Sequence, residues 1–215
     1  MSRLRLTISM SLDGYVAGPH QSVKEPLGVG GEALHEWVFP LAAWREPHGM
    51  KGGEVNESTP VVEHTLTNIG ATIMGRNMFG GGPGPWNTEQ PWIGWWKDNP
   101  PFHHPVFVLT HYPREPLPLK GGTTFHFITG GIHDALEQAR RAAAGKDVAL
   151  AGGAQVCNQY LKAGLVDEMH LHIAPVFLGG GRRLFEDHTS AAPAQLERTG
   201  VVASPSGVVH VSYRR

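Results

Sequence analysis

The chain has 215 residues, and its 18 lysines and arginines face 19 aspartates and glutamates, which gives a formal net charge of −1. This length suits one domain with a full hydrophobic core, and the balanced charge favours neither nucleic acid nor an anionic membrane as a partner. No apolar run approaches the roughly 18 residues of a membrane span. We therefore expect a single globular domain over residues 1–215.

The start of the chain and its cysteine content favour the cytoplasm. The N-terminal segment MSRLRLTISMS lacks the apolar region of a secretory signal. Cys157 is the only cysteine, so no disulfide can form within the chain, which fits a reducing compartment. We expect a cytoplasmic protein.

The N-terminal segment predicts a strand followed by a turn. Apolar and polar residues alternate from Arg3 to Met10, which is the period of a strand with one buried face. Asp13 and Gly14 form a turn pair after this strand. Residues 18–31 contain many glycines and prolines without a clear period, so we expect a loop there.

A helix is predicted over Glu32–Ala43, because four apolar residues follow one another at helical spacing. Pro40 implies an end or a kink just before it. On such a helix Glu32, His35 and Glu36 would share one side.

The rest of the chain alternates helices with short apolar strands. A helix is expected to begin near Thr59, where proline follows, and to end at Gly70. Further helices are expected over residues 131–144 and 154–162, and strands over residues 71–74, 106–110, 124–128, 148–151, 168–174, 196–204 and 208–213. This alternation predicts an α/β three-layer sandwich around a central mixed, mostly parallel sheet, with the C-terminal hairpin antiparallel at one edge.

Residues 85–101 form an unusual segment with four tryptophans among prolines and charged residues. Such a loop can wall a pocket, cover the domain's own core or form a subunit contact. Together with the apolar segment 172–178, it leads us to expect a homodimer.

The predicted strand 148–151 runs into Gly152 and Gly153, which open the helix at Ala154. A strand, glycines and a helix in this order aim backbone N–H groups and a positive helix end at a phosphate. The same glycines also suit a tight strand-to-helix turn, so the pair alone does not decide between a site and a turn.

Several motifs stand in a fixed order along the chain: SLDGYVAG over residues 11–18, MGRNMFG over 74–80, AGGAQVCNQYL over 151–161 and AGLVDEMHLHIAPVFLGGG over 163–181. Together they resemble the dihydrofolate-reductase-like superfamily, and they are most similar to the reductase domain of riboflavin biosynthesis and its single-domain relatives. The resemblance covers the chain from Leu4 to Phe185. It implies NADPH lying across the carboxyl ends of the strands.

The resemblance also implies which residues hold this cofactor. Gly75 and Arg76 match a glycine–arginine pair beside the adenosine 2′-phosphate, and Thr110 with His111 match the residues that complete that site. An arginine fork with a hydroxyl suits a phosphate dianion better than a ribose diol, which favours NADPH over NADH. The residues implied at the pyrophosphate are Gly152, Gly153, Ala154, Gln155 and Val156. Those implied near the nicotinamide are Ser9, Val16 and Ala17.

The chain departs from the riboflavin-reductase pattern at several places. Thr7 stands where a lysine is typical, and Ala151 stands where a glutamate is typical. The loop 18–31 has no clear counterparts of the arginines that bind the substrate's ribose phosphate. The chain also lacks the H-x-E and P-C-x-x-C motifs of the zinc deaminase that often precedes this reductase.

The implied function is that of an NADPH-dependent oxidoreductase. It would reduce a small heterocyclic substrate of the pterin, pyrimidine or a related type, resembling 5-amino-6-(5-phosphoribosylamino)uracil reductase or dihydrofolate reductase. The protein must then orient the cofactor, exclude water and place an acid. Asp13 is the favoured catalytic residue, with Glu36 or His35 second, although Asp13 beside Gly14 suits a turn former equally well.

Two other functions stay open. A nucleotide-binding module of the same fold, with little or no turnover, would retain the phosphate-site residues and lose those for the substrate. A metalloenzyme would depend on His170 and His172, which share one face of a strand, and on His103 with His104. A closed zinc site needs further ligands, so we expect no metal.

Overall fold

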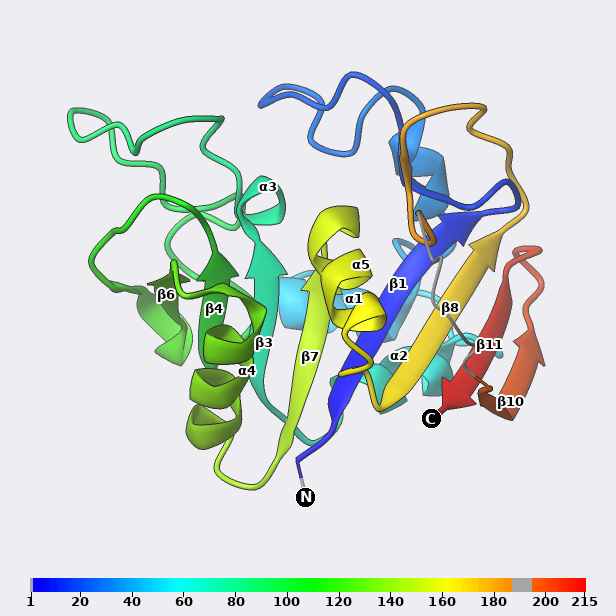
Figure 1. Ribbon diagram of the computed structural model, residues 1–215. Helices are drawn as coiled ribbons and strands as arrows, with labels where there is room; N and C mark the ends of the chain where they lie inside the picture. The colour runs from blue at the N-terminus through cyan, green and yellow to red at the C-terminus, as the bar shows by residue number, and fades with distance from the viewer. Residues whose placement is uncertain (1, 187–194) are drawn as a thin grey trace.

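The computed structural model describes residues 2–186 and 195–215, and its centre is a nine-stranded sheet (Figure 1). The strand order is β10-β11-β8-β1-β7-β3-β4-β6-β5. The inner strands run parallel: β8 (Glu168–Ala174), β1 (Leu4–Ser11), β7 (Asp147–Gly152), β3 (Ile69–Gly75), β4 (Pro105–Leu109) and β6 (Thr124–Ile128). Antiparallel strands lie at both edges: β10 (Glu197–Ala203) with β11 (Val209–Arg214), and β5 (Leu117–Pro118). The predicted mixed, mostly parallel sheet is confirmed.

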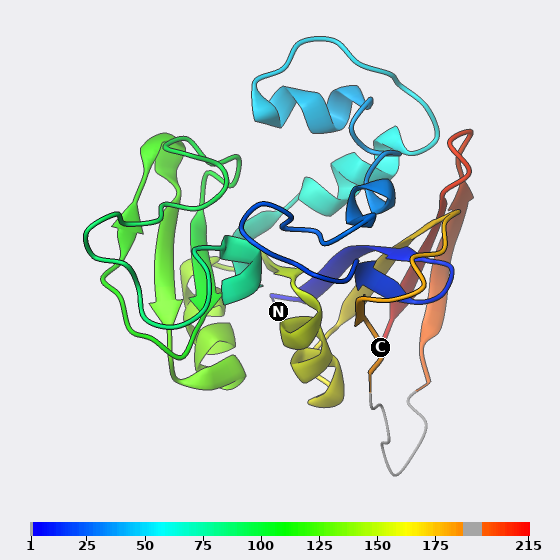
Figure 2. The same cartoon turned by 90° about the horizontal axis from the view of Figure 1, so that it is seen from above.

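Helices cover both faces of the sheet, which gives the domain three layers (Figures 1 and 2). One face carries α4 (Gly131–Ala142) and α5 (Ala154–Lys162). The other face carries α2 (Thr59–Leu66), α1 (Ala42–Arg45) and the 3₁₀ helices η1 (Gly31–Leu34) and η2 (Glu46–His48). The remaining short elements are β2 (Tyr15–Ala17), which pairs with β9 (Arg182–Arg183), α3 (Arg76–Phe79) and the 3₁₀ helix η3 (Lys120–Gly122).

The largest core lies between the sheet and the pair α4 and α5. Ala135 and Ala139 lie one turn apart on α4 and are fully buried, so this side of the helix faces the sheet. On α5, Cys157 and Tyr160 are also fully buried, and the Tyr160 hydroxyl donates to the carbonyl oxygen of Ile132 at 2.8 Å. Burial raises the pKa of the Cys157 thiol to about 12. Each large apolar side chain buried here stabilises the fold by about 1.5–3 kcal/mol.

The predicted helix over Glu32–Ala43 is wrong. The chain forms the 3₁₀ helix η1, continues in turns through Pro40, and begins α1 only at Ala42. Pro40 has no N–H to donate to the carbonyl one turn earlier. In addition, Trp37 packs beneath the sheet and donates its indole N–H to Ser9 Oγ at 3.1 Å. Tertiary contacts therefore outweigh the apolar spacing, and the helical side expected to join Glu32, His35 and Glu36 does not form.

The helix predicted to end at Gly70 is shorter than expected, because α2 ends at Leu66 and β3 already begins at Ile69. Thr67 takes extended dihedral angles, and its N–H closes the last turn on the carbonyl oxygen of Glu63 at 3.0 Å. The other predicted elements lie within two residues of the observed ones.

Strand β1 is covered on both faces, whereas its alternating sequence predicts one solvent face. Leu4 and Leu6 point into the core beneath α4 and α5. The intervening Arg5 is only 3% exposed, and its guanidinium donates to the carbonyl oxygens of Thr67 and His64 at 2.9 and 2.8 Å. The polar face of β1 is thus buried beneath the end of α2.

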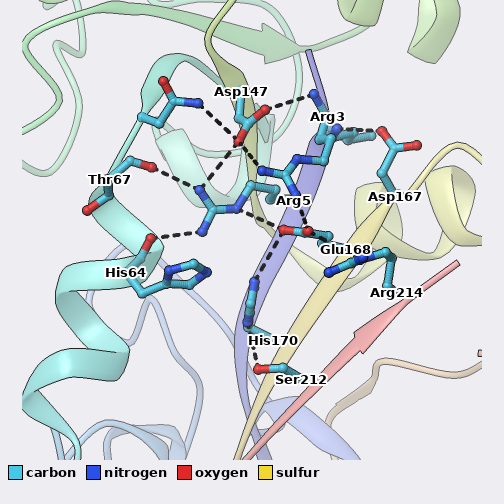
Figure 3. Close-up of polar contacts among 12 residues, drawn as sticks. Arg3, Arg5, His64, Thr67, Asp147, Asp167, Glu168, His170, Ser212 and Arg214 are labelled. Atoms are coloured by element: carbon cyan, nitrogen blue, oxygen red, sulfur yellow. Dashed lines mark hydrogen bonds and ion pairs between the residues drawn. The ribbon is translucent and has the colours of Figure 1, made fainter. Parts of the chain in front are cut away.

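A network of ion pairs surrounds Arg5 at the amino ends of β1, β7 and β8 (Figure 3). Arg5 Nη1 lies 3.7 Å from Asp147 Oδ2, and its Nε lies 3.5 Å from Glu168 Oε2. Arg3 bridges the same two carboxylates, and Arg214 Nε lies 3.8 Å from Glu168 Oε1. Burial lowers the pKa of His170 to about 4, although Glu168 Oε2 lies 3.9 Å from its Nε2.

A second polar cluster lies further along the same face. The Nδ1 atoms of His172 and His210 are 2.8 Å apart, and His210 Nε2 lies 2.8 Å from Ser58 Oγ. The ring of Trp37 lies 4.8 Å from each imidazole. Burial lowers the pKa of His172 to about 3 and that of His210 to about 4. Two neutral rings can share one Nδ1 hydrogen, which two charged rings cannot do.

The tryptophan-rich segment 85–101 covers the end of the sheet formed by β3, β4 and β6. Trp86, Trp92 and Trp96 pack against a cluster that includes Phe79 and Phe125. Trp95 lines a cavity instead. The segment thus covers the domain's own core and also walls a pocket, two of the three roles that its composition allows.

Candidate functional site

A cavity of about 700 Å³ opens beside the carboxyl end of β3. Its walls come from residues in the segments 18–26, 76–83 and 181–182, and from Trp95. The segment 18–26 follows β2 and the segment 76–83 follows β3. In open α/β sheets, ligands bind in the crevice outside the carboxyl ends of the strands, where this cavity lies.

The double glycine lies at the matching end of β7. Gly152 has φ +126°, a conformation that disfavours side chains, and the peptide bond to Gly153 is cis. Gly153 is the N-cap of α5 and has open space where a Cβ would point. The N–H of Val156 donates to the carbonyl oxygen of Gly153 at 3.0 Å. Ala154 and Gln155 belong to the first turn of α5. Their N–H groups have no carbonyl partner within the helix, because no earlier helical residue is available to accept from them.

The two glycine motifs meet in space. A Cβ added to Gly75 would come 2.8 Å from Val156 Cγ2 and 3.6 Å from the backbone nitrogen of Gly153. The end of β3 therefore touches the first turn of α5, and a side chain at position 75 would require Val156 to shift. The residues implied at the 2′-phosphate and at the pyrophosphate belong to one surface.

Arg76 opens α3 and is half-buried. Its Nη2 donates to the carbonyl oxygen of Gly82 at 3.1 Å, and its Nη1 lies 3.5 Å from Thr110 Oγ1. Its Nε is buried and has no hydrogen-bond partner. Burial, and then the charge of Arg114, lower the pKa of the Arg76 guanidinium. The guanidinium thus keeps unused donors at the carboxyl end of the sheet.

The other two residues implied at the 2′-phosphate differ in their surroundings. Thr110 Oγ1 accepts the N–H of Tyr112 at 3.2 Å and faces Arg76, which fits a shared site. His111 is exposed on the turn that follows.

The residues implied near the nicotinamide are buried. Ser9 is 5% exposed, and its hydroxyl accepts the indole N–H of Trp37, so this side chain belongs to the face beneath η1. Val16 packs in the main core and Ala17 is 6% exposed. Their backbone leads directly into Gly18, in the cavity wall.

Asp13 lies in the turn after β1, where its carboxylate accepts three hydrogen bonds. Ser11 Oγ donates at 2.6 Å, and the N–H groups of Leu178 and Gly179 donate at 3.1 and 2.7 Å. The hydrogen bond from Ser11 is the largest cause that holds the pKa of Asp13 below its usual value. An ionised carboxylate of this kind ties the turn after β1 to the segment before β9.

Glu36 and His35 lie on turns of the segment between η1 and α1. Glu36 is exposed, and it is not among the described residues that line the cavity. His35 stacks on Phe39 with ring centroids 6.3 Å apart, and its Nδ1 is buried without a hydrogen-bond partner. Burial lowers the pKa of His35.

The histidines considered as metal ligands have other partners. His170 Nδ1 lies 2.9 Å from Ser212 Oγ, and His104 Nε2 lies 2.7 Å from Thr72 Oγ1. Within residues 2–186 and 195–215, no group of three or more His, Cys, Asp or Glu side chains is arranged to hold a metal ion.

Sequence reasoning missed Trp86 and Arg114 as neighbours of Arg76. The Arg76 Cζ atom lies 3.3 Å from the centroid of the Trp86 ring, and the Arg114 Cζ atom lies 5.1 Å from it. The tryptophan content of the segment 85–101 is a signal for such a contact, but no spacing rule links Trp86 to a residue ten positions earlier.

The sequence comparison agrees with this geometry, because the model of the RibD C-terminal domain family matches residues 2–210. The chain belongs to the RibD C-terminal domain family. This family is the reductase domain of riboflavin biosynthesis proteins, so the expected relationship is confirmed. Membership supports a reductase-like enzyme, without naming its substrate.

Relatives of this RibD-family chain differ in how much of their length it matches. The uncharacterised protein YyaP of Bacillus subtilis (strain 168) is 41% identical over 69 residues, which are 32% of this chain and 36% of YyaP. The chain thus matches about a third of that curated relative.

Two solved structures share the fold. A candidate riboflavin biosynthesis protein from Shewanella sp. PV-4 has a TM-score of 0.62 at 19% identity, over 99% of this chain and 98% of that one. Dihydrofolate reductase from Enterococcus faecalis, solved in complex with NADP(H), has a TM-score of 0.51 at 12% identity, over 99% of this chain and 96% of that one. The dihydrofolate-reductase-like fold is therefore confirmed. None of the helices that the structure describes has the length and apolar character needed to cross a bilayer.

Proposed function

We propose that this protein is an NADPH-dependent oxidoreductase that reduces a small heterocyclic compound of the pterin, pyrimidine or a related class. The observation that supports this most is the contact between Gly75 and the first turn of α5. It joins an arginine with unused donors to a helix N-terminus that follows a double glycine, on one surface beside a cavity. The fold similarity to a dihydrofolate reductase solved with NADP(H) adds support.

The chain's own residues fit the phosphates of this cofactor. The N–H groups of Ala154 and Gln155, at the positive end of α5, suit the pyrophosphate. Arg76 and Thr110 suit the 2′-phosphate, because the buried Nε of Arg76 and the long contact from its Nη1 leave the guanidinium short of acceptors. His111 is exposed next to this position and stays a candidate. The bound NADPH would supply the hydride.

The substrate would lie in the cavity walled by the segment after β2. Asp13 supports that wall indirectly, since its carboxylate holds Leu178 and Gly179, two residues before Gly181 in the wall. We therefore assign Asp13 a positioning role, because its lowered pKa disfavours the protonated form that a donor needs. Glu36 then becomes the first candidate for the acid.

The alternative is a nucleotide-binding module with little or no turnover. The departures at Thr7 and Ala151 favour it, because Thr7 lies half-buried on β1 opposite His170, where the related reductases typically have a lysine. Neither Thr7 nor Ala151 is among the residues that we propose to bind the phosphates. Binding and turnover therefore have to be measured separately.

Titration with NADPH, followed by tryptophan fluorescence, tests the binding. Trp86 lies against the Arg76 guanidinium, and Trp95 lies in the cavity wall. We therefore expect binding to quench the tryptophan fluorescence. Arg76→Gln should weaken NADPH binding at least tenfold, and Arg141→Gln, in an exposed pair on α4, serves as the matched control. Absence of wild-type binding at millimolar NADPH would rule out the proposal. Binding without NADPH oxidation across a panel of pterins, pyrimidines and quinones would favour the module.

We also propose a cytoplasmic homodimer. Phe177 follows β8 within the apolar segment 172–178, and 76% of its surface is exposed. An exposed aromatic side chain of this size suits a subunit contact. Light scattering that returns the mass of one chain would reject the dimer.

A further inference from the structure

Arg76 and Arg114 meet at one tryptophan ring. The Arg76 Cζ atom lies 3.3 Å from the centroid of the Trp86 ring, within the distance of a close cation–π contact. Arg114 Cζ lies 5.1 Å from the same centroid and 4.9 Å from that of Phe127. Two cationic side chains from different segments, one after β3 and one after β4, thus share one aromatic neighbour.

Trp86 is fixed in place. Its indole N–H donates to the carbonyl oxygen of Tyr112 at 2.9 Å. Its ring packs edge-on against Phe79 at 5.8 Å and Phe127 at 5.0 Å. A ring held by one hydrogen bond and two aromatic contacts has little freedom to turn, so it sets the plane in which the Arg76 guanidinium lies.

The two cations lack neutralising partners. Across the described residues, neither Arg76 nor Arg114 forms an ion pair with a carboxylate, and the charge of Arg114 acts unfavourably on Arg76. Arg114 Nη1 donates to the carbonyl oxygen of Trp92 at 2.7 Å, which satisfies a donor but leaves the charge. Paired like charges of this kind are stabilised by a dianion.

We propose that Trp86 and Arg114 determine the preference of this site for a 2′-phosphorylated adenosine. Trp86 is a positioning residue that holds the Arg76 guanidinium flat, with its edge turned to Thr110 and Gly82. Arg114 supplies the second positive charge, so a phosphomonoester dianion is favoured over a free 2′-hydroxyl. This inference rests on the proposed function, and it extends the site beyond the glycine–arginine pair to the tryptophan-rich segment.

Calorimetric binding of two nucleotides without a nicotinamide provides the test. The probes are adenosine 2′,5′-bisphosphate, which has the 2′-phosphate, and adenosine 5′-diphosphate, which has none. The wild-type protein should bind the first more tightly. Trp86→Ala and Arg114→Gln should each reduce this preference about tenfold, while the affinity for adenosine 5′-diphosphate changes little. Trp86→Phe, which keeps a ring under the guanidinium, should retain most of the preference.

The pH dependence separates an electrostatic role from a structural one. A phosphomonoester dianion takes up one proton near pH 6 and becomes a monoanion, so the wild-type preference should fall between pH 7.5 and pH 5. Arg114→Gln should flatten this dependence, and Arg141→Gln should leave it unchanged.

The outcomes distinguish the inference from the proposed function. If the wild-type protein binds both nucleotides equally, or if the variants lose both affinities in parallel while circular dichroism reports an intact fold, the inference is wrong and nucleotide binding stands. If the wild-type protein binds neither nucleotide, the inference is wrong, and the titration with NADPH decides the proposed function separately. If Trp86→Ala fails to fold, the nucleotide preferences of Arg114→Gln and Trp86→Phe test the inference without it.

Discussion

Arg5 and Glu168 face each other across the parallel strands β1 and β8, with Arg5 Nε 3.5 Å from Glu168 Oε2 and both residues almost completely buried. Their positions in the chain are far apart, so the pair forms only when β8 has docked beside β1. The contact therefore forms only in the observed register of the two strands.

Removal of one partner should destabilise the fold strongly. Arg5→Leu leaves the buried carboxylates of Glu168 and Asp147 with only the half-exposed Arg3 and Arg214 as cations, so we expect a loss of up to about 3–5 kcal/mol in the free energy of unfolding. Urea denaturation measures it. Arg5→Leu combined with Glu168→Leu should lose less than Arg5→Leu alone, whereas equal losses would contradict the view that Arg5 compensates the buried charge of Glu168. The exposed pair Arg141–Glu137 provides the control, at about 0–1 kcal/mol.

Acid should destabilise the protein already above pH 4. Folding lowers the pKa values of His170, His172 and His210 to between about 3 and 4, from about 6.5 in an unfolded chain. These groups stay neutral in the folded state, so their contribution is complete above pH 6.5 and is lost progressively as the pH falls towards 4. Each imidazole changes the free energy of unfolding by up to about 1.4 kcal/mol per pH unit.

Urea midpoints at pH 7, 6 and 5 measure this dependence. His170→Gln removes one titrating group and should reduce the slope, while the exposed His133→Gln should not. A midpoint that stays constant from pH 7 to pH 5 would contradict the buried, neutral state of these imidazoles.

Gly75→Ala should impair nucleotide binding more than stability. The added methyl group would meet Val156 Cγ2 at 2.8 Å and displace the first turn of α5. We expect an at least tenfold weaker affinity for NADPH, measured by fluorescence titration. Val156→Ala should restore part of it by making room. Gly180→Ala is the matched control, because its Cβ would meet no atom within 4 Å; an equal effect of both alanines would exclude the steric explanation.

Asp13→Asn should loosen the segment before β9 without removing an acid from the reaction. The amide keeps one acceptor for the N–H groups of Leu178 and Gly179 and loses the charge. Hydrogen exchange at these two amides should accelerate. The pH profile of any NADPH oxidation should keep its shape. A profile that loses one limb would instead identify Asp13 as the proton donor.

The sequence predicts the sheet and the meeting of the glycine motifs well because both depend on local patterns. Short apolar strands alternate with helices of clear period, and the glycines at 75, 152 and 153 lie at strand ends, where chain order alone brings them to one edge of a parallel sheet. The segment around Trp37 follows a different rule. Its apolar spacing is helical, but the segment forms turns. Trp37 donates its indole N–H to Ser9, and Pro40 has no N–H for a helical hydrogen bond.

The burial of Arg5 cannot be predicted from the sequence pattern of β1 alone. Alternation distinguishes the two faces of a strand, but it does not say that a helix will cover the polar one. The partners of Arg5, at Asp147 and Glu168, come from strands added much later in the chain. The contact of Arg76 with Trp86 is hidden for the same reason, since an irregular loop folds back onto the arginine.

Cys157 lies one turn inside α5, fully buried and with a pKa raised to about 12, so its thiol reacts only when this helix opens. As the sole cysteine, it gives a single labelling signal for the whole chain. We expect a nucleotide bound at the first turn of α5 to slow this labelling. The rate of modification of Cys157 by a thiol reagent would then report whether the proposed phosphate site is occupied.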